Sequence, residues 1–176
     1  MLGEVNVTGE KIQTDQTQEI KIKDIKMAPS ASGNTVEGII QQQAGVSTHS
    51  ELSSQYNVRG GAFDENSVYI NNVEVYRPFL VRSGQQEGLS VINPYMVDKI
   101  GFSTGGYAAK YGDKMSSALD ITYKTLKAKG KKPVVEGSAA ASLLGADAYV
   151  GLGTQKLSWL NSVRYKTTSY LLGTME

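Results

Sequence analysis

Few residues of this 176-residue chain have the type and spacing that chemistry requires. The chain has no cysteine and a single histidine, His49, which excludes disulfides, thiolate metal sites, cysteine nucleophiles and multi-histidine metal sites. The glycine pairs Gly60-Gly61 and Gly105-Gly106 lack the spacing of phosphate-binding loops, and no Ser/His/Asp set or carboxylate cluster accompanies them. The sequence therefore predicts no enzyme, no cofactor and no metal site.

Composition argues against a polyanionic partner. Lys plus Arg number 18 against 17 for Asp plus Glu, so there is no electrostatic case for nucleic acid. No run of about 18 apolar residues is present, and Met1-Leu2-Gly3-Glu4 lacks the basic and apolar segments of a signal peptide. If the natural protein is exported, we expect this chain to have lost its leader.

The remaining polar and aromatic side chains suit recognition. Arg59 ends a short strand before a glycine pair, where it fits either a surface ion pair or a bidentate bond to carboxylates on another surface. The run from Tyr76 to Leu80 (YRPFL) leads into a polar loop, and Tyr, Phe and Arg give much contact area at low entropy cost. His49 lies in the hydroxyl-rich loop from Val46 to Gln55, where it is either simply exposed or a ligand contact.

Short strands ended by turns must position these side chains. Four β-patterned runs stop at clusters of Gly, Pro, Asn or Asp: Tyr56 to Val58, Ser67 to Val75, Lys99 to Ser103 and Ser117 to Lys124. Asn tolerates left-handed φ, so Asn71-Asn72 predicts a hairpin within the second run.

One helix and one helical turn complete this part of the chain. The helix is predicted from about Thr35 to Gln43, capped by Asn34 or Thr35 and stopped by Gly45, with an apolar stripe that packs on the sheet. A helical turn opens at Asn93-Pro94. The result is an α+β domain with four strands over about Ile20 to Lys124.

The two ends of the chain differ from this domain. Residues 1–27 are polar with sparse isoleucines and predict an extended arm, with one short strand at Glu19 to Ile22. Residues 125–133 form a basic linker, either a solvated spacer or a lipid headgroup site.

The tail alternates residue types as transmembrane β-strands do. Small and apolar residues alternate with Glu and Ser from Val135 to Leu143, and the pattern returns at Ala148 to Leu152 and at Leu157 to Lys166. Trp159 and Tyr165 suit an interfacial aromatic belt. Three such strands cannot close a barrel, so we interpret the chain as a fragment with an incomplete antiparallel barrel from residue 134 to 176.

Five short motifs in order resemble the plug domain of a TonB-dependent outer-membrane receptor. Leu2 to Thr8 resembles the TonB-box-like LxEVxVT segment of Bacteroidetes-type receptors, which involves Glu4, Val5, Asn6, Val7 and Thr8. The other motifs are Arg59-Gly60, Val68 to Val73 (VYINNV), Val97 to Ile100 (VDKI) and Tyr111-Gly112-Asp113. The resemblance implies a periplasmic arm (1–27), a plug with a small mixed sheet and short helices (28–124), the linker and the first barrel strands.

The resemblance also implies roles and partners. The plug would block the lumen of its own β-barrel in the cell outer membrane, contact an imported iron chelate, cobalamin or glycan, and signal to the periplasmic domain of TonB. Arg59 matches the plug arginine that pairs with barrel glutamates, although Thr104-Gly105-Gly106 stands where a second arginine is common. The substrate contacts expected on apical loops are His49, Phe63, Asp64, Tyr76, Arg77 and Phe79.

Two other classes of function compete with this reading. A hydrolase or nucleotide-binding enzyme would have to use the glycine-rich turns, which lack the required spacing. A soluble secreted β-rich adhesion module would need Val135 to Tyr165 to fold in water, whereas a barrel fragment would leave this stretch unpaired and detergent-seeking.

Overall fold

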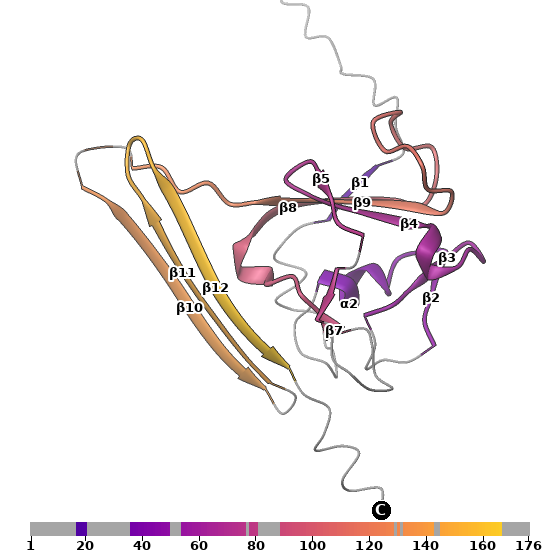
Figure 1. Cartoon of the computed structure of the whole chain (residues 1–176), viewed down its shortest axis with the longest axis horizontal. Coiled ribbons are helices and arrows are strands. Elements are labelled where there is room, and N and C mark those ends of the chain that lie inside the picture. The colour runs from indigo at the N-terminus through magenta and orange to yellow at the C-terminus, as the bar shows by residue number, and fades with distance from the viewer. Residues whose placement is uncertain are drawn as a thin grey trace, which may run out of the picture.

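A mixed sheet, with a helix on one face and a separate three-stranded sheet at one end, makes up the fold (Figure 1). The computed structural model describes residues 17–20, 36–49, 54–76, 78–80, 89–128, 130, 132–142 and 145–166. The TonB-box-like segment, the predicted cap residues Asn34 and Thr35, and Arg77 lie outside the described residues. We call residues 17–123 the sheet domain.

The main sheet has five strands in the order β1-β8-β9-β4-β5. Parallel pairing of β4 with β9 makes the sheet mixed, as predicted, because the other neighbours are antiparallel. The count is five instead of the expected four. The arm adds an edge strand and the second β-patterned run supplies two strands, whereas the run at Tyr56 to Val58 lies outside this sheet. The bounds are β1 (Gln18–Ile20), β4 (Asn66–Ile70), β5 (Val73–Glu74), β8 (Val97–Ser103) and β9 (Ser117–Tyr123).

The predicted Asn71-Asn72 turn is confirmed. Both residues have positive φ, 51° and 64°, as the favoured two-residue hairpin turn requires. The side-chain oxygen of Asn71 also accepts a hydrogen bond from the Tyr123 amide at 2.8 Å. The turn therefore joins β4 to β5 and at the same time holds the end of β9.

Helix α2 (Val36–Ile40) packs its apolar residues under this sheet. It is shorter than the predicted helix, because the amides of Gln42 and Gln43 bond three residues back and tighten the last turn. Gly45 follows at φ +80°, where glycine carries no steric penalty. The buried core consists of Ile20, Val36, Ile39, Ile40, Tyr56, Val58, Val68, Ile92, Val97, Ile100, Phe102, Leu119 and Ile121.

Two small antiparallel pairs lie outside the main sheet. Strand β2 (Val46–Ser47) pairs with β3 (Asn57–Val58), so the expected loop from Val46 contains a strand, and the run at Tyr56 to Val58 does not join the main sheet. Gly45 and Arg59, which flank the same end of this pair, both have positive φ. Strand β6 (Phe79–Leu80) pairs with β7 (Leu89–Ser90).

Two short 3-10 turns precede strands of the main sheet. They are η1 (Phe63–Glu65), before β4, and η2 (Pro94–Met96), before β8. The side chain of Asn93 caps η2 by accepting from the Tyr95 amide at 3.0 Å, and Pro94 occupies the first position, as the sequence predicts.

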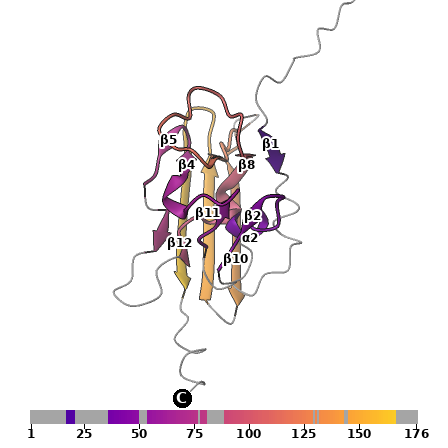
Figure 2. The ribbon, with the colours of Figure 1, turned by 90° about the vertical axis from the view of Figure 1, so that its right-hand side faces the viewer.

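Three nine-residue antiparallel strands form a wall beside the sheet domain (Figures 1 and 2). The wall consists of β10 (Val134–Ser142), β11 (Gly145–Gly153) and β12 (Ser158–Lys166), with every residue of β10 and β12 paired to β11. The bounds of β10 and β12 lie within one residue of the predicted alternating segments, whereas β11 extends the predicted segment Ala148 to Leu152 at both ends. No helix among the described residues is long and apolar enough to cross a membrane.

The two faces of the wall differ as the alternation predicts. The outer face exposes Val135, Val150, Trp159, Val163 and Tyr165. The inner face, toward the sheet domain, carries the half-buried Glu136, Ser138, Asp147 and Arg164 and the buried Tyr149. Asn161 and Leu160 break the pattern, because the polar residue is exposed and the apolar one is half-buried.

Candidate functional site

The predicted recognition residues lie on different parts of the sheet domain. His49 follows β2 and is exposed, and its Nε2 lies 3.3 Å from the side-chain nitrogen of Asn57 on β3. Tyr76 follows β5 and is 77% exposed. Phe79 begins β6, where its backbone pairs with Ser90. The short β2–β3 and β6–β7 pairs lie on the same side of the main sheet as α2 (Figure 1).

Phe63 and Asp64 belong to η1 and have different surroundings. The ring of Phe63 packs against the core and meets Tyr56 edge to face, with 6.0 Å between the ring centroids. Asp64 is exposed, and its backbone carbonyl accepts a hydrogen bond from Lys114 Nζ at 2.9 Å. Core packing therefore accounts for part of the burial of Phe63 without any substrate.

The Arg59 side chain extends across two glycine turns. Its backbone adopts φ 50° and its amide donates to the Gly45 carbonyl at 2.8 Å. A Cβ placed on Gly105 would lie 3.0 Å from the guanidinium, and one placed on Gly45 would lie 3.5 Å from the side-chain stem. The absence of side chains at Gly45 and Gly105 therefore provides the path that Arg59 follows. Residue 59 is exposed, so the guanidinium is accessible from outside the sheet domain.

A buried polar junction between the sheet domain and the wall was not predicted. We define the wall junction as Glu37 of α2, Ser90 of β7, Asp147 of β11 and Arg164 of β12. Asp147 and Arg164 are opposite each other across two wall strands, and Arg164 Nε lies 2.6 Å from Asp147 Oδ1, with side chains only 4% and 12% exposed. Ser90 Oγ donates to Glu37 Oε1 at 2.7 Å.

Arg164 links the two halves of this junction. Its Nη1 donates to the backbone carbonyls of Ser90, at 3.3 Å, and Ile92, and lies 3.3 Å from Ser90 Oγ. Nearby, Asn93 Nδ2 donates to the Ala148 carbonyl of β11 at 3.4 Å. The segment from Ser90 to Asn93 is thus bonded to the wall at several points.

The electrostatics of the junction extend into the core. Glu37 is 3% exposed. Burial first, and then the negative charge of Glu37, raise the pKa of Tyr56. Tyr123 has a pKa raised by burial and by Glu37, which the positive charge of Arg164 partly offsets. The Arg164 charge therefore acts on the sheet domain as well as on Asp147.

The linker after β9 lies partly on the wall and not only in solvent. The Leu126 amide donates to Ser158 Oγ at 3.0 Å, and the Ala128 amide donates to the Thr154 carbonyl at 3.3 Å. A Cβ on Gly151 would lie 2.5 Å from a Leu126 methyl, and one on Gly153 would lie 2.6 Å from the Leu126 carbonyl oxygen. Two glycines of β11 thus form a seat for the linker, whereas Lys127 is exposed.

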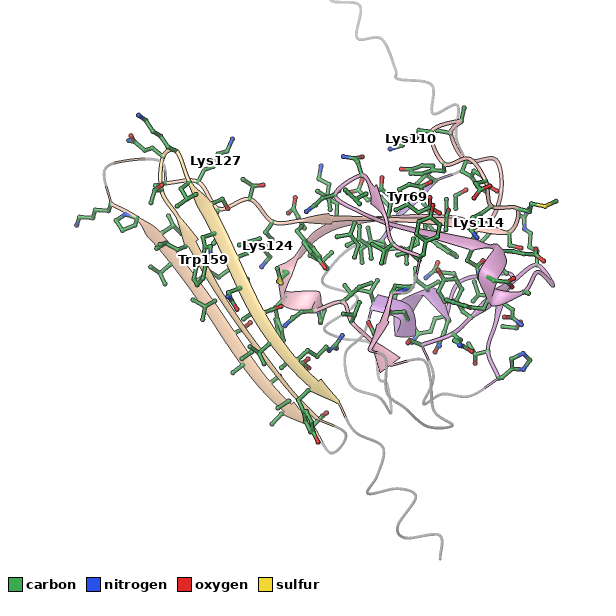
Figure 3. The ribbon with its side chains drawn as sticks, viewed as in Figure 1. Tyr69, Lys110, Lys114, Lys124, Lys127 and Trp159 are labelled. Atoms are coloured by element: carbon green, nitrogen blue, oxygen red, sulfur yellow. The ribbon has the colours of Figure 1, made fainter. Side chains whose placement is uncertain are left out.

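Lys124 occupies the gap between the sheet domain and the wall (Figure 3). Its Nζ lies 2.6 Å from Glu136 Oε1 on β10 and 5.6 Å from the ring centroid of Tyr149 on β11. This lysine places a positive charge where the chain passes from one part to the other.

A second polar cluster lies on the sheet domain away from the wall (Figure 3). The hydroxyl of Tyr111 donates to Asp120, Lys110 lies 3.4 Å from the same carboxylate, and the rings of Tyr111 and Tyr69 are 5.1 Å apart. Burial and the bond to Asp120 raise the pKa of Tyr111. Among the described residues, no group of three or more His, Cys, Asp or Glu side chains is arranged to hold a metal.

Comparison with known proteins supports the likeness of fold. The family model for the TonB-dependent receptor plug domain matches residues 10–118. A solved ferric enterobactin receptor in complex with BCV-L6 is 21% identical with a TM-score of 0.53, and covers 85% of this chain and 24% of that receptor. A mutant of the ferric enterobactin receptor from Pseudomonas aeruginosa is 19% identical with a TM-score of 0.50, and the match covers 80% of this chain and 22% of that receptor. No curated protein matches the chain. The chain thus spans about a quarter of the length of these receptors.

Proposed function

The chain belongs to the family of TonB-dependent receptor plug domains, and we propose from this premise that it gates energised uptake across the outer membrane. In this proposal, residues 28–124 form the plug, residues 1–27 the periplasmic arm, residues 125–133 the linker, and the strands from residue 134 onward the first part of the barrel. The observation that carries the proposal is the polarity of the wall. Its inner face bonds to the plug through Arg164, while its outer face is apolar except for Asn161.

The proposed mechanism couples the two ends of the plug. Substrate bound at the apical loops biases the arm toward exposure, and TonB captures the arm by adding a strand to its own sheet. The substrate contacts that we propose are His49, Phe63, Asp64, Tyr76, Arg77 and Phe79. The imported ligand is proposed only as a class, an iron chelate, cobalamin or glycan, because the likeness to ferric enterobactin receptors is one of fold.

Arg59 is the proposed plug side of a lock to acidic residues of the barrel. Its exposure and its extended path over Gly105 support this role. A guanidinium at such a position offers two parallel donors to a carboxylate.

Binding to TonB tests the gating proposal directly. A purified fragment covering residues 1–124 is titrated with the periplasmic domain of TonB, before and after deletion of Leu2 to Thr8. We expect saturable binding that the deletion abolishes, because strand addition requires that segment. Deletion of the neighbouring Gly9 to Asp15, which has the same length, is the control and should leave binding in place.

Two outcomes would contradict the proposal. Absence of binding by a fragment with native circular dichroism would favour the adhesion alternative. Equal loss of binding on both deletions would mean that the arm acts only through its length, and not through a TonB box at Glu4 to Thr8.

A further inference from the structure

Arg164 presents its charge to the backbone of the plug. Three of its contacts are with acceptors on the plug segment from Ser90 to Ile92, although the residue itself belongs to barrel strand β12. A buried guanidinium is stable only when it is paired and hydrogen-bonded, and Asp147 supplies the pairing carboxylate from the adjacent strand. The pair therefore joins two barrel strands and also places a hydrogen-bond donor, Arg164 Nη1, against the carbonyls of the plug segment.

The geometry uses the fork of arginine. One edge of the guanidinium, at Nε, lies against Asp147, while Nη1 serves the plug carbonyls. A lysine ammonium is a point charge without this fixed fork, so it cannot keep both directions of contact with the same geometry. The arrangement thus predicts that Lys is a poor substitute for Arg at this position.

Ser90 is the residue on which the contacts converge. Its hydroxyl donates to Glu37 of α2, accepts from the Ile92 amide at 3.2 Å and lies beside Arg164. Ser90 is also the last residue of β7 and pairs with Phe79 of β6. The β6–β7 hairpin is therefore bonded to the plug core on one side and to the barrel wall on the other.

We propose that Arg164, oriented by Asp147, is a positioning residue that fixes the β6–β7 hairpin of the plug against the barrel. This inference rests on the proposed function, because Phe79 on this hairpin is one of the proposed substrate contacts. Movement of the hairpin on substrate binding would then loosen the plug from the wall at the same contact. The device differs from the Arg59 lock, since here the arginine belongs to the barrel and its acceptors are plug carbonyls.

Hydrogen–deuterium exchange of the full-length receptor in detergent tests the inference. We expect the amides of Val91 and Ile92 to exchange at least about tenfold faster in Arg164→Lys and in Arg164→Gln, because their local opening is no longer opposed by the wall. The amides shared by β8 and β9 should keep their wild-type rates. Lys156→Gln, in the exposed turn between β11 and β12, is the matched control for loss of one wall charge.

A second set of variants separates local from global effects. Asp147→Asn should also accelerate exchange at Val91 and Ile92, and the double variant with Arg164→Gln should be no faster than Arg164→Gln alone, because the two residues act as a unit. If Arg164→Gln fails to assemble, Arg164→Lys and Asp147→Asn still provide the local reading, because both keep the Ser90 hydroxyl that accepts from the Ile92 amide. Unchanged exchange in Arg164→Lys, or equal acceleration in β8 and β9, would overturn the inference.

Exchange does not require TonB, so failure of the inference and failure of the proposed function are distinguishable. Binding of TonB by the arm together with unchanged exchange in Arg164→Lys would reject only the positioning role. Faster exchange at Val91 and Ile92 in a receptor whose arm does not bind TonB would support the contact and reject the gating mechanism.

Discussion

Tyr56 places a phenol in the core close to a buried carboxylate. The side chain is 2% exposed, and its ring meets Phe63 and Phe102 edge to face. Burial and the charge of Glu37 raise its pKa above the ordinary value of 10.0. An acid with a raised pKa in the folded state stabilises the fold below its unfolded pKa, and this contribution is lost as the pH rises above that value.

Replacement of Tyr56 by Phe should therefore make the plug less sensitive to alkali. We expect the free energy of unfolding of the wild type to fall from about pH 9 to about pH 11, and that of Tyr56→Phe to fall less over the same range. Urea unfolding followed by circular dichroism measures both profiles. Tyr76→Phe, at an exposed position, should follow the wild type, and parallel profiles for all three proteins would contradict the assignment.

The sequence predicts a residue's conformation where that conformation depends on neighbouring residues in the chain. It does not predict hydrogen-bond partners that are distant in the chain. Gly45 is predicted to stop the helix and has positive φ, because the requirement at a helix end is local. Arg164 lies within the alternating segment predicted from Leu157 to Lys166, yet its acceptors lie 72 to 74 residues earlier in the chain. Only the register of β11 with β12 and the packing of β7 bring them together.

The turn between β4 and β5 reverses the chain and also supplies a hydrogen-bond acceptor to β9. Asn71 adopts φ 51° and accepts from the Tyr123 amide, whereas Asn72 only needs φ 64°. Asn71→Ala should destabilise the plug by about 1–2 kcal/mol. Left-handed φ is less favourable for alanine than for asparagine, and the Tyr123 amide loses its side-chain acceptor.

Asn72→Gly is the matched variant for the same turn. Glycine adopts positive φ without steric cost, so we expect stability to be unchanged or raised by up to about 1 kcal/mol. Thermal or urea unfolding of the two variants beside the wild type makes the comparison. Similar destabilisation by both changes would show that the backbone geometry, and not the Asn71 side chain, limits the turn.

The strands that could be predicted from the sequence are those with a long alternating pattern or a clear turn. The hairpin at Asn71-Asn72 and the three wall strands belong to this group. Strand β2 was missed because Val46–Ser47 has only two residues, too few to show a period of two. The place of Tyr56 to Val58 was also missed, because Val58 packs into the core from outside the main sheet, and the pattern of a short strand does not specify its partner.

The wall and the plug together define an inside and an outside. Val163 lies on the outer face of β12, next to the inward-facing Arg164 of the wall junction. Because the proposed function places this face in the lipid, Val163→Arg should destabilise the assembled receptor by as much as about 2–4 kcal/mol if the residue lies near the bilayer midplane.

Heat-modifiable migration of the full-length receptor on gels measures its assembly. Gln155→Arg, in the exposed turn after β11, adds the same charge in water and should assemble as the wild type does. Normal assembly of Val163→Arg in membranes would place this face in a second protein or in water, and the wall would then not be part of a lipid-facing barrel.

Gly151 and Gly153 of β11, on which the linker lies, limit where the plug of one receptor can be joined to the barrel of another. The linker backbone fits over Gly151 and Gly153 at distances that leave no room for a Cβ, so its path depends on the barrel sequence. A chimeric receptor joined within residues 125–133 would combine a linker from one parent with a β11 surface from the other. A junction placed after β11 would keep the linker and the β11 surface from the same parent. Chimeric receptors joined there should assemble, whereas chimeras joined within the linker should not.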